Sequence, residues 1–383
     1  MAAVGRIRLL YLIGSLDRGG TAVHLTELVR RLDPDRFAVE ICCLGQAGPL
    51  AEGVRERGIV VHELGVPVVY RPGFAEGMFR LSRLVRRGGY GIVHGLLFAA
   101  DVFGTLAARI GGAPVVVNSR RMMPSDERPR RRRAYRLANR WVDRSVAPSE
   151  AVRRSCLELE GGAPERVVTI HNGIDPARIR GAAPAEDLPA GDGPWILTAG
   201  GINPLKGHET LVRALPAILE RIPAARVAVA GDGPLRDRVV ALAERLEVRH
   251  ALVLLGVRSD IPSLLARADL FVQPSDSEGM SNAVLEAMAA GRAVVATAVG
   301  GNPEVVDDGT TGSLVPPGDP PALAQAVIDL LQDTEKSRRF GACGSNRVDR
   351  EFTVQRMAEA TATFYDGLIV ATELAPASGE TVR

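Results

Sequence analysis

Short apolar runs alternate with amphipathic stretches along almost the whole chain. In the first half, seven runs have the length and composition of buried strands: 8–13, 38–44, 60–64, 91–94, 115–118, 145–147 and 167–170. Stretches with helical spacing of apolar positions lie between them, as at 22–31 and 100–110. Because strand and helix alternate, we predict a parallel, doubly wound sheet with helices on both faces.

The second half repeats this rhythm. Strands are predicted at 195–199, 226–230, 251–254, 270–273, 293–296 and 312–315. Helices are predicted at 207–221, 235–245, 261–267, 281–290, 320–333 and 353–368. The pattern therefore indicates α/β architecture with two doubly wound, Rossmann-like domains.

A break near the midpoint separates the two halves. Residues 180–194, RGAAPAEDLPAGDGP, are rich in proline, glycine and alanine and lack an apolar period. We predict an N-terminal domain at 1–180, a linker at 181–194 and a C-terminal domain at 195–363, with a last helix at 364–383 completing the first domain. Ligands of open α/β sheets bind beyond the carboxyl ends of the strands, so we expect the site in a cleft between the domains.

Composition narrows the function classes. The 383 residues carry a formal net charge of only +2, which gives no general attraction to nucleic acid. The four cysteines show no C-x-x-C spacing, and the six histidines form no metal-binding pair. The only Asp-x-Asp, at Asp33 and Asp35, lies far from the expected site. We expect no metal ion and no disulfide framework.

The apolar run near the N-terminus has two interpretations. It is short, contains Arg8 and lacks a small-residue cleavage site, so it fits a first buried strand better than a signal peptide. No stretch approaches the roughly 18–20 apolar residues that span a bilayer. We therefore expect a cytoplasmic protein.

Two common nucleotide motifs are missing. The turn after the first strand reads GSLDRGG at 14–20, which is not G-x-G-x-x-G, and no G-K-[ST] loop occurs. Both NAD-dependent and P-loop chemistry are therefore disfavoured.

Residues 271–306 hold the most informative chemistry. A strand ends near 273, a polar loop carries Glu278, and a helix that contains Glu286 begins near Ser281. The unpaired N–H groups at a helix start favour an anion, and carboxylates accept pairs of sugar hydroxyls. Taken alone, the two glutamates also fit an ordinary solvated helix face.

The wider pattern resembles family 4 retaining glycosyltransferases. Glu278 and Glu286 match the E-x7-E motif of that family, within EGMSNAVLEAMAAGRAVVATAVGGNPEVV at 278–306. The likeness extends to GDGP at 231–234, DDGTTGSLVP at 307–316, DRGGT at 17–21 and HNGID at 171–175. It is strong over 195–318 and looser before 180, and it implies the GT-B architecture of two domains across a cleft.

The resemblance also implies roles for individual residues. Glu286 would hold the ribose, Glu278 the transferred hexose, and Lys206 the diphosphate as a point charge. The remaining substrate-binding candidates are glycine-loop and helix-start positions: Gly19, Gly20, Gly201, Gly233, Gly279, Met280, Ser281 and Asn282. The family usually has an arginine five or six residues before the lysine, where this chain has Gly201 and Gly200. We expect Arg120, Arg121 or the helix dipole at Ser281 to compensate, unless the protein is slow or inactive.

His94 and Arg120 are further catalytic candidates, on the acceptor side. The family often has a histidine after an N-terminal strand, and Arg120 stands at about that position. His94, at the end of the preceding strand, either enters the cleft or is a buried structural residue. No general base is assigned, because in this family the leaving phosphate is thought to help deprotonate the acceptor.

A basic stretch runs from Arg120 to Arg154. It holds twelve arginines against four acidic residues, a balance of +8, with Tyr135, Leu137 and Trp141 interspersed at helical spacing. We expect either that this stretch binds peripherally to the anionic inner face of the membrane, or that it forms a solvated, salt-bridged helix. A nucleic-acid patch is a third, less favoured interpretation.

The sequence thus predicts a metal-independent retaining glycosyltransferase. It would transfer a hexose or N-acetylhexosamine from a nucleotide sugar, with a UDP-sugar favoured, to a glycan or lipid-linked acceptor, without a cofactor. The alternatives are a UDP-sugar epimerase on the same fold and a catalytically inactive nucleotide-sugar-binding partner.

Overall fold

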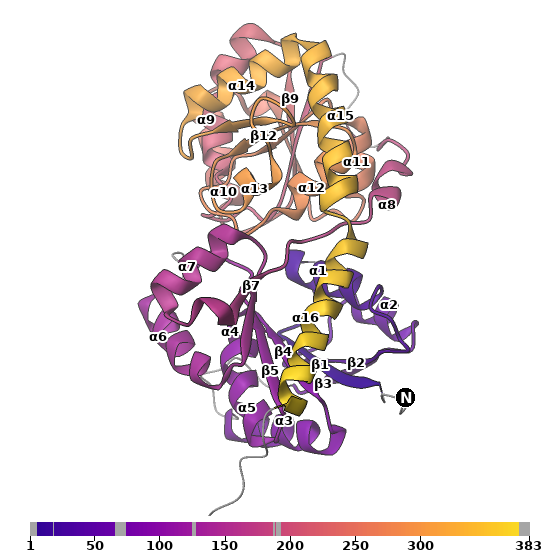
Figure 1. Ribbon diagram of the computed structural model, residues 1–383. Helices are drawn as coiled ribbons and strands as arrows, with labels where there is room; N and C mark the ends of the chain where they lie inside the picture. The colour runs from indigo at the N-terminus through magenta and orange to yellow at the C-terminus, as the bar shows by residue number, and fades with distance from the viewer. Residues whose placement is uncertain are drawn as a thin grey trace, which may run out of the picture. The chain divides into compact units, whose positions relative to one another are not determined.

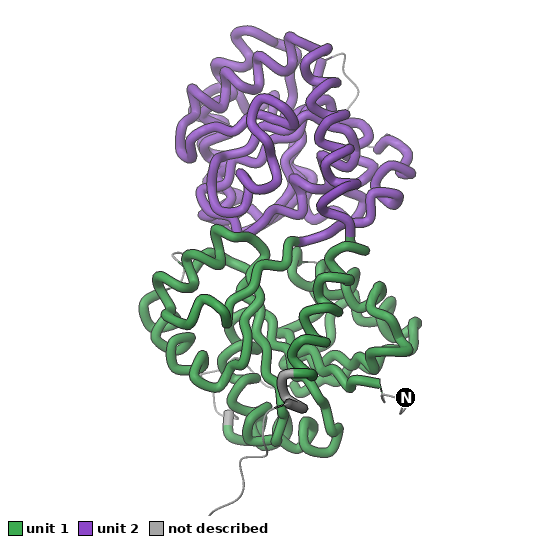
Figure 2. The backbone as a smooth tube through the Cα atoms, viewed as in Figure 1, with its two compact units in different colours: residues 1–171, 354–383 green, residues 172–353 purple. Residues whose placement is uncertain are grey.

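The computed structural model describes residues 6–17, 19–65, 74–124, 128–186, 188 and 193–374 (Figure 1). The chain forms two compact units, one of residues 1–171 and 354–383 and the other of residues 172–353 (Figure 2). Several sequence predictions fall outside the described residues: the first five positions, Arg18 of the glycine loop, Asp126 and Glu127 of the basic stretch, most of 187–192 in the linker, and 375–383 of the last helix.

The first unit is built on a seven-stranded parallel sheet with the order β3-β2-β1-β4-β5-β6-β7. Its strands are β1 (Ile7–Ile13), β2 (Phe37–Cys43), β3 (Val60–Glu63), β4 (Ile92–Leu96), β5 (Val115–Ser119), β6 (Arg144–Ala147) and β7 (Val167–Thr169). The central strand β1 is apolar on both faces, as expected where helices cover both sides of a parallel sheet. The order reverses between β1 and β4, which makes their carboxyl ends the switch point of this sheet.

Helices cover both faces of this sheet, and each face has its own apolar core. The helices are α1 (Gly20–Val29), α2 (Ala51–Arg55), α3 (Phe74–Gly88), α4 (Leu97–Ala99), α5 (Thr105–Ile110), α6 (Pro129–Ala138), α7 (Glu150–Glu160) and α16 (Val354–Leu374). A π-helical turn, η1 (Ala100–Gly104), links α4 to α5, and short 3-10 turns follow α6 and α7 at η3 (Asn139–Trp141) and η4 (Pro164–Arg166).

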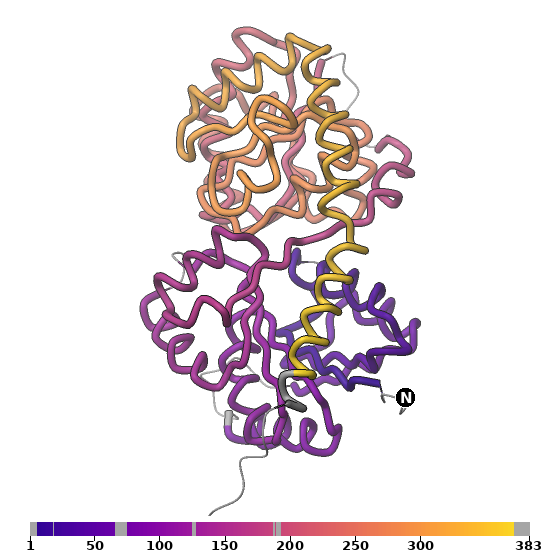
Figure 3. The backbone as a smooth tube through the Cα atoms, in the orientation of Figure 1, coloured from indigo at the N-terminus to yellow at the C-terminus, as the bar shows by residue number. Residues whose placement is uncertain are grey.

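The C-terminal helix α16 belongs to the first unit and lies along α1 (Figure 3). Tyr365 anchors it, because its hydroxyl is 2.8 Å from the Tyr11 hydroxyl and 2.6 Å from Nδ1 of His94. All three side chains are buried, and Arg36 pairs with Asp366 at the surface. A single phenol therefore connects the last helix to two central strands of the sheet.

The second unit has a six-stranded parallel sheet with the order β10-β9-β8-β11-β12-β13. Its strands are β8 (Trp195–Ala199), β9 (Arg226–Ala230), β10 (Leu252–Gly256), β11 (Leu270–Gln273), β12 (Ala293–Thr297) and β13 (Ser313–Val315). Here the switch point lies between β8 and β11.

Two apolar cores fill the faces of this second sheet. The helices are α8 (Pro176–Arg180), α9 (His208–Arg221), α10 (Arg236–Arg245), α11 (Ile261–Arg267), α12 (Asn282–Ala289), α13 (Asn302–Val305), α14 (Pro320–Gln332) and α15 (Thr334–Glu351), with a 3-10 turn η5 (Arg249–Ala251) before β10.

The thirteen predicted strands are all present, with ends shifted by at most two residues. The unit boundaries differ from the sequence prediction, since the chain passes between units at 171/172 and 353/354. The reason is packing: α8 contacts α11 and α12, Leu188 joins the core, and the Ala185 amide donates to Ser263 O at 2.9 Å. Much of the expected linker is thus an edge of the second unit.

One long helix was missed in the sequence. The 18 residues of α15, TEKSRRFGACGSNRVDRE, are mostly polar and carry two glycines, so their helical period is weak. The glycines have a packing role, because they let α15 approach the backbone at Gly291 and the Met288 side chain. Among the residues that the structure describes, no helix is long and apolar enough to cross a membrane.

Removing the Tyr365 hydroxyl should destabilise the first unit. Tyr365→Phe leaves Nδ1 of His94 and the Tyr11 hydroxyl buried without this partner, a loss of about 1–3 kcal/mol in the free energy of unfolding. Urea unfolding followed by circular dichroism measures it. Tyr90→Phe is the matched control, because Glu40 keeps Arg8 and His62 as partners when it loses the Tyr90 hydroxyl. Equal, small losses in both variants would contradict this role of Tyr365.

Candidate functional site

Two loops meet at the switch point of the second unit. One follows β8 and leads into α9, and the other follows β11 and leads into α12. The amides of Asp276 and Ser277 both donate to the Leu205 carbonyl, at 2.9 and 3.3 Å. Backbone hydrogen bonds therefore fix the loop that carries Lys206 against the loop that carries Glu278.

Two glycines make this approach sterically possible. Gly207 has a left-handed φ of 60°, and a Cβ there would lie 1.8 Å from the Pro274 carbonyl oxygen. Gly300, with φ 52°, backs the same loop from β12, where a Cβ would lie 1.6 Å from the Glu278 carbonyl oxygen. Glu278 is thus held from two sides by backbone that tolerates only glycine.

Lys206 and Glu278 form a bidentate ion pair across these loops. The ammonium Nζ lies 2.8 Å from both carboxylate oxygens. The Glu278 side chain is 9% exposed and that of Lys206 24%, so water screens the pair less than it screens a surface pair. Within the described part of the chain, Glu278 is the one carboxylate that pairs with this ammonium, close to the start of α12.

The start of α12 is defined by Ser281. Its Oγ accepts the amide of Val284 at 3.3 Å, which makes Ser281 the N-cap. Asn172 steadies this end, because its Nδ2 donates to Oδ1 of Asn282 at 2.8 Å and its backbone amide points at the Met280 sulfur. The positive end of the helix dipole therefore has a fixed place, next to Gly279 and Met280.

Glu286 lies one turn further along α12, on the same side as Asn282. Burial raises the pKa of its carboxyl to about 7, and nearby Arg178 only partly opposes this. Among the described residues its carboxylate has no hydrogen-bond partner. A half-protonated carboxyl without a partner is suited to receive hydroxyl groups of a ligand.

The glycine loops after β8 and β9 also pack together. The Ile202 amide donates to Asp232 O at 2.9 Å, and the Leu235 amide donates to Ile202 O at 3.1 Å. These bonds place Gly201 beside Gly233 at the same edge of the sheet. The second unit therefore brings Gly201, Lys206, Gly233 and the segment from Glu278 to Glu286 to one end of its strands.

The candidates in the first unit lie at the end of its own strands. Gly19 precedes α1 and Gly20 begins it; both are exposed, and the Gly19 amide donates to Asp17 O at 2.7 Å. They follow β1 at the switch point of that sheet. Their contribution to ligand binding stays a prediction.

His94 lies in the environment of a buried structural residue, which is one of the two interpretations that the sequence allows. It is 3% exposed, Nδ1 lies 2.6 Å from the Tyr365 hydroxyl and Nε2 lies 2.8 Å from Oγ of Ser119. Burial, with a smaller effect of Arg121, lowers its pKa to about 3. Both ring nitrogens are occupied and the ring stays neutral, so the geometry favours a core histidine over a catalytic base.

Arg120 is also occupied. Its guanidinium lies 2.8 Å from Glu160, 3.0 Å from Asp101 and 3.7 Å above the ring centre of Tyr135. The side chain is 3% exposed, and the two acids outweigh burial and raise its pKa. This arginine already balances two buried carboxylates, so the geometry does not favour it as the replacement for the missing diphosphate-binding arginine.

Sequence reasoning overlooked Asn172 and Arg178 as supports of the site. Asn172 lies in the quoted HNGID segment, but only the fold brings that segment against the start of α12. No group of three or more metal-ligating side chains occurs within the described residues.

Comparison with known proteins assigns the chain to a family. The family model "Glycosyltransferase Family 4" matches residues 18–178, and "Glycosyl transferases group 1" matches residues 193–333. The chain is 30% identical over 397 residues to D-inositol 3-phosphate glycosyltransferase 2 of Catenulispora acidiphila, covering 92% of this chain and 91% of that protein. This chain belongs to glycosyltransferase family 4.

Other relatives carry related names. The D-inositol 3-phosphate glycosyltransferase of Mycobacterium tuberculosis is 30% identical over 353 residues, which are 83% of this chain and 72% of that protein. The family assignment confirms the resemblance found in the sequence and identifies this protein as a glycosyltransferase.

Solved structures agree on the fold. Anabaena Alr3699/HepE in complex with UDP and glucose superposes with a TM-score of 0.84 at 23% identity, over 94% of this chain and 100% of that one. Sucrose-phosphate synthase from Thermosynechococcus elongatus gives 0.79 at 20% identity, over 96% and 100%. The predicted fold class, two Rossmann-like domains of the GT-B type, is confirmed.

Proposed function

We propose that this glycosyltransferase transfers a hexose or N-acetylhexosamine from a UDP-sugar, with retention of configuration, without a metal ion or cofactor. The observation that carries the proposal is the Lys206–Glu278 pair beside the start of α12, at the switch point of the second sheet. The UDP complexes of Alr3699/HepE support the choice of nucleotide by likeness of fold.

The ion pair gives a physical route to sugar-donor binding. A diphosphate carries more negative charge than one carboxylate, so it competes with Glu278 for the Lys206 ammonium. Glu278, released from the lysine, then accepts hydroxyl groups of the hexose, while the start of α12 faces the phosphates. Lys206 and the helix dipole stabilise the charge that develops on the leaving group.

The proposed reaction needs no protein nucleophile. The bond between C1 of the sugar and the β-phosphate oxygen breaks, and a bond from C1 to the acceptor oxygen forms on the same face. The acceptor proton passes to the departing phosphate oxygen. The enzyme's contribution is positioning and electrostatic stabilisation, which agrees with the occupied, neutral state of His94.

For the acceptor, the sequence predicts a glycan or a lipid-linked group. The names of the relatives add a polyol phosphate to these classes. A glycan and a polyol phosphate both offer hydroxyl groups, and a polyol phosphate that forms the headgroup of a phospholipid is also lipid-linked.

Glu286 should couple nucleotide binding to pH. Ribose hydroxyls favour its ionised form, and its carboxyl takes up a proton as the pH falls through about 7. We expect the affinity for UDP-glucose, which has no phosphate titrating in this range, to fall between pH 8 and pH 6. Glu286→Gln should bind about tenfold or more weaker at pH 8 and show a flat profile.

Glu278→Gln is the matched variant for calorimetry. It should keep or raise UDP affinity, because Lys206 loses the carboxylate that competes with the diphosphate, and it should abolish sugar transfer. Proton NMR of the wild-type product gives its anomeric configuration. If nucleotide affinity and turnover were unchanged in both Glu286→Gln and Glu278→Gln, these glutamates would not belong to the donor site. A product with inverted anomeric configuration would exclude a retaining reaction.

This chain has glycine where the family usually has a diphosphate-binding arginine, and a substitution can restore the arginine. Gly201 has a backbone outside the left-handed region, and its Cβ would meet the Asn203 side chain at 3.3 Å and, at ordinary contact distance, the Asp232 carbonyl oxygen at 3.6 Å. Gly201→Arg should therefore place a second cation near Lys206 and raise kcat/KM at least tenfold. Gly200→Arg is the control, because φ 147° disfavours any side chain there. If Gly201→Arg binds nucleotide but shows no transfer with any acceptor, the inactive binding partner becomes the better account.

Contact with an anionic membrane is proposed for the basic stretch. Leu137 and Trp141 are 51% and 42% exposed at a spacing of four residues, and Arg133, Arg136 and Arg140 are exposed between and beside them. Exposed apolar side chains among arginines fit an interfacial helix, with each arginine contributing about 1 kcal/mol near anionic lipid.

Liposome co-sedimentation tests this contact. The wild type should pellet with vesicles of anionic phosphatidylglycerol but not with neutral phosphatidylcholine, and Trp141→Glu should lose most of the binding. Phe79→Glu, at an exposed apolar position on α3, should behave as wild type. Equal pelleting with both vesicle types would exclude the electrostatic contact.

A further inference from the structure

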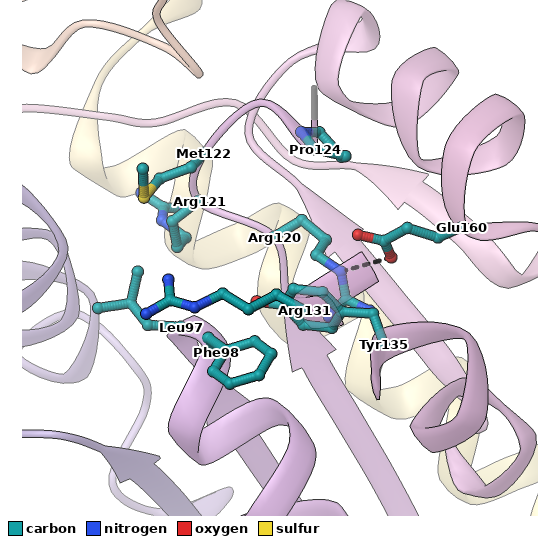
Figure 4. Close-up of a pocket in the computed structure, with 9 residues that line it drawn as sticks. All are labelled: Leu97, Phe98, Arg120, Arg121, Met122, Pro124, Arg131, Tyr135 and Glu160. Carbon is teal, nitrogen blue, oxygen red and sulfur yellow. Dashed lines mark hydrogen bonds and ion pairs between the residues drawn. The ribbon is translucent and has the colours of Figure 1, made fainter. Parts of the chain in front are cut away.

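Two buried carboxylates of the first unit share one guanidinium. Nε of Arg120 donates to Oε2 of Glu160 at 2.8 Å, and Nη1 donates to Oδ2 of Asp101 at 3.0 Å. Figure 4 shows the Arg120–Glu160 contact, with the Tyr135 ring beside the same guanidinium. All three charged side chains are at most 4% exposed. If both acids were ionised, one positive charge would face two buried negative charges, which is costly in a medium of low dielectric constant.

Asp101 lies on the π-helical turn η1, which packs on the end of β5. Gly95 of β4 pairs with Asn118 of β5, and paired residues of a parallel sheet lie on the same face, about 4.8 Å apart. A Cβ at Gly95 would lie 2.8 Å from the Ala100 carbonyl oxygen and 3.2 Å from Cα of Asp101, so η1 fills the space above this glycine. The Asn118 side chain is therefore directly beside the start of η1.

This buried space contains polar atoms without a hydrogen-bond partner. Asn118 is fully buried, and neither its Oδ1 nor its Nδ2 has a partner among the described residues. The same is true of Oδ1 of Asp101. In an ionised aspartate both oxygens only accept, so Oδ1 of Asp101 cannot bond the amide oxygen of Asn118. A proton on Oδ1 of Asp101 makes it a donor to that amide oxygen and satisfies both atoms.

The charge around Asp101 favours the protonated acid. The charged groups that act on it most strongly are Arg120, from the segment after β5, and Glu160, from α7. Burial has the largest effect. Together with Glu160 it outweighs the guanidinium and the Ser119 amide, and it raises the pKa of the Asp101 carboxyl to about 8.

The charged groups of the neighbouring elements are engaged elsewhere. Arg109 of α5 pairs with another acid, and Arg131 of α6 lies over an aromatic ring. His94 of β4 lies on the opposite face of the sheet, where Arg121 lowers its pKa and its ring contacts Tyr365. The charge balance at Asp101 is therefore set mainly by Arg120 and Glu160.

We propose that Asp101 is a protonated, neutral carboxylic acid in the folded protein and that its proton is a pH-sensitive anchor of η1. Oδ1 carries the proton and donates a hydrogen bond to Oδ1 of Asn118, while the charge of Arg120 is balanced by Glu160. Loss of the proton in alkaline solution leaves two carboxylates on one guanidinium and two acceptor oxygens facing each other. The contact between η1 and the end of β5 then loosens. This anchor does not depend on the proposed function.

Infrared spectroscopy of the full chain tests the protonation state. The wild type at pH 7 should show the carbonyl band of a protonated carboxylic acid, and Asp101→Asn should lose its intensity. The difference between the two spectra isolates Asp101, because Glu286 contributes a similar band to both. Asp143→Asn is the matched control, since Asp143 accepts Nη2 of Arg109 at 2.6 Å and shares that guanidinium with no second acid in the described part of the chain. It should leave the band unchanged.

The pH dependence of unfolding tests the anchor. An unfolded aspartate has a pKa near 4, so folding takes up a proton at Asp101 between about pH 4 and pH 8. The stability that this proton gives is lost as the pH rises towards 8. Asp101→Asn keeps an uncharged, donating side chain at every pH. From pH 5 to pH 8 its folding equilibrium constant should therefore rise at least hundredfold relative to that of the wild type in urea unfolding, and Asp143→Asn should show no such rise.

Asn118→Leu distinguishes the anchor from an ionised Asp101 that accepts the amide nitrogen of Asn118. Removing an acceptor from the protonated acid should lower the midpoint of the infrared titration, whereas removing a donor to a carboxylate would raise it. A raised midpoint overturns the proposal. So does an infrared spectrum that Asp101→Asn leaves unchanged, as expected if a buried water bridges an ionised acid, or a ratio of folding constants that stays level with pH. If Asn118→Leu fails to fold, the two measurements on Asp101→Asn decide.

Discussion

The ion pair between Lys206 and Glu278 is the interaction on which this account depends. It joins the loops after β8 and β11, and it exists because Gly207 and Gly300 let backbone segments approach more closely than any side chain would permit. The pair neutralises both charges while no ligand is bound. A partly buried pair of this kind is sensitive to its surroundings, since either partner alone would be an uncompensated charge. In the proposed reaction, the diphosphate and the hexose of the donor would each replace one partner of this pair.

The first unit uses buried charge differently. Arg120 pairs with both Asp101 and Glu160, so its positive charge is balanced inside the unit. One carboxylate oxygen of each acid has no hydrogen-bond partner among the described residues. The two ring nitrogens of His94 are likewise engaged in hydrogen bonds with Tyr365 and Ser119. Arg120 and His94 thus hold buried partners of the first unit together.

Sequence reasoning succeeded where local pattern decides the structure. Every predicted strand is present, because buried parallel strands are continuous apolar runs between turn residues. Lys206 and Glu278 could be found because each lies in a loop after a strand, within a segment that resembles the family 4 pattern. It failed where distant segments decide. The polar helix α15 depends on packing against α12, and the sequence around Arg120 does not reveal that Glu160, forty residues later, takes up its charge. His94 was left between two roles for the same reason, since its partner Tyr365 comes from the other end of the chain.

The most direct test of the central claim is a crystal structure of the chain with an intact UDP-sugar. The account predicts that Nζ of Lys206 leaves Glu278 for a diphosphate oxygen, that the Glu278 carboxylate accepts hydroxyls of the hexose, and that Glu286 contacts the ribose. An unbroken Lys206–Glu278 pair with the nucleotide bound elsewhere would contradict it.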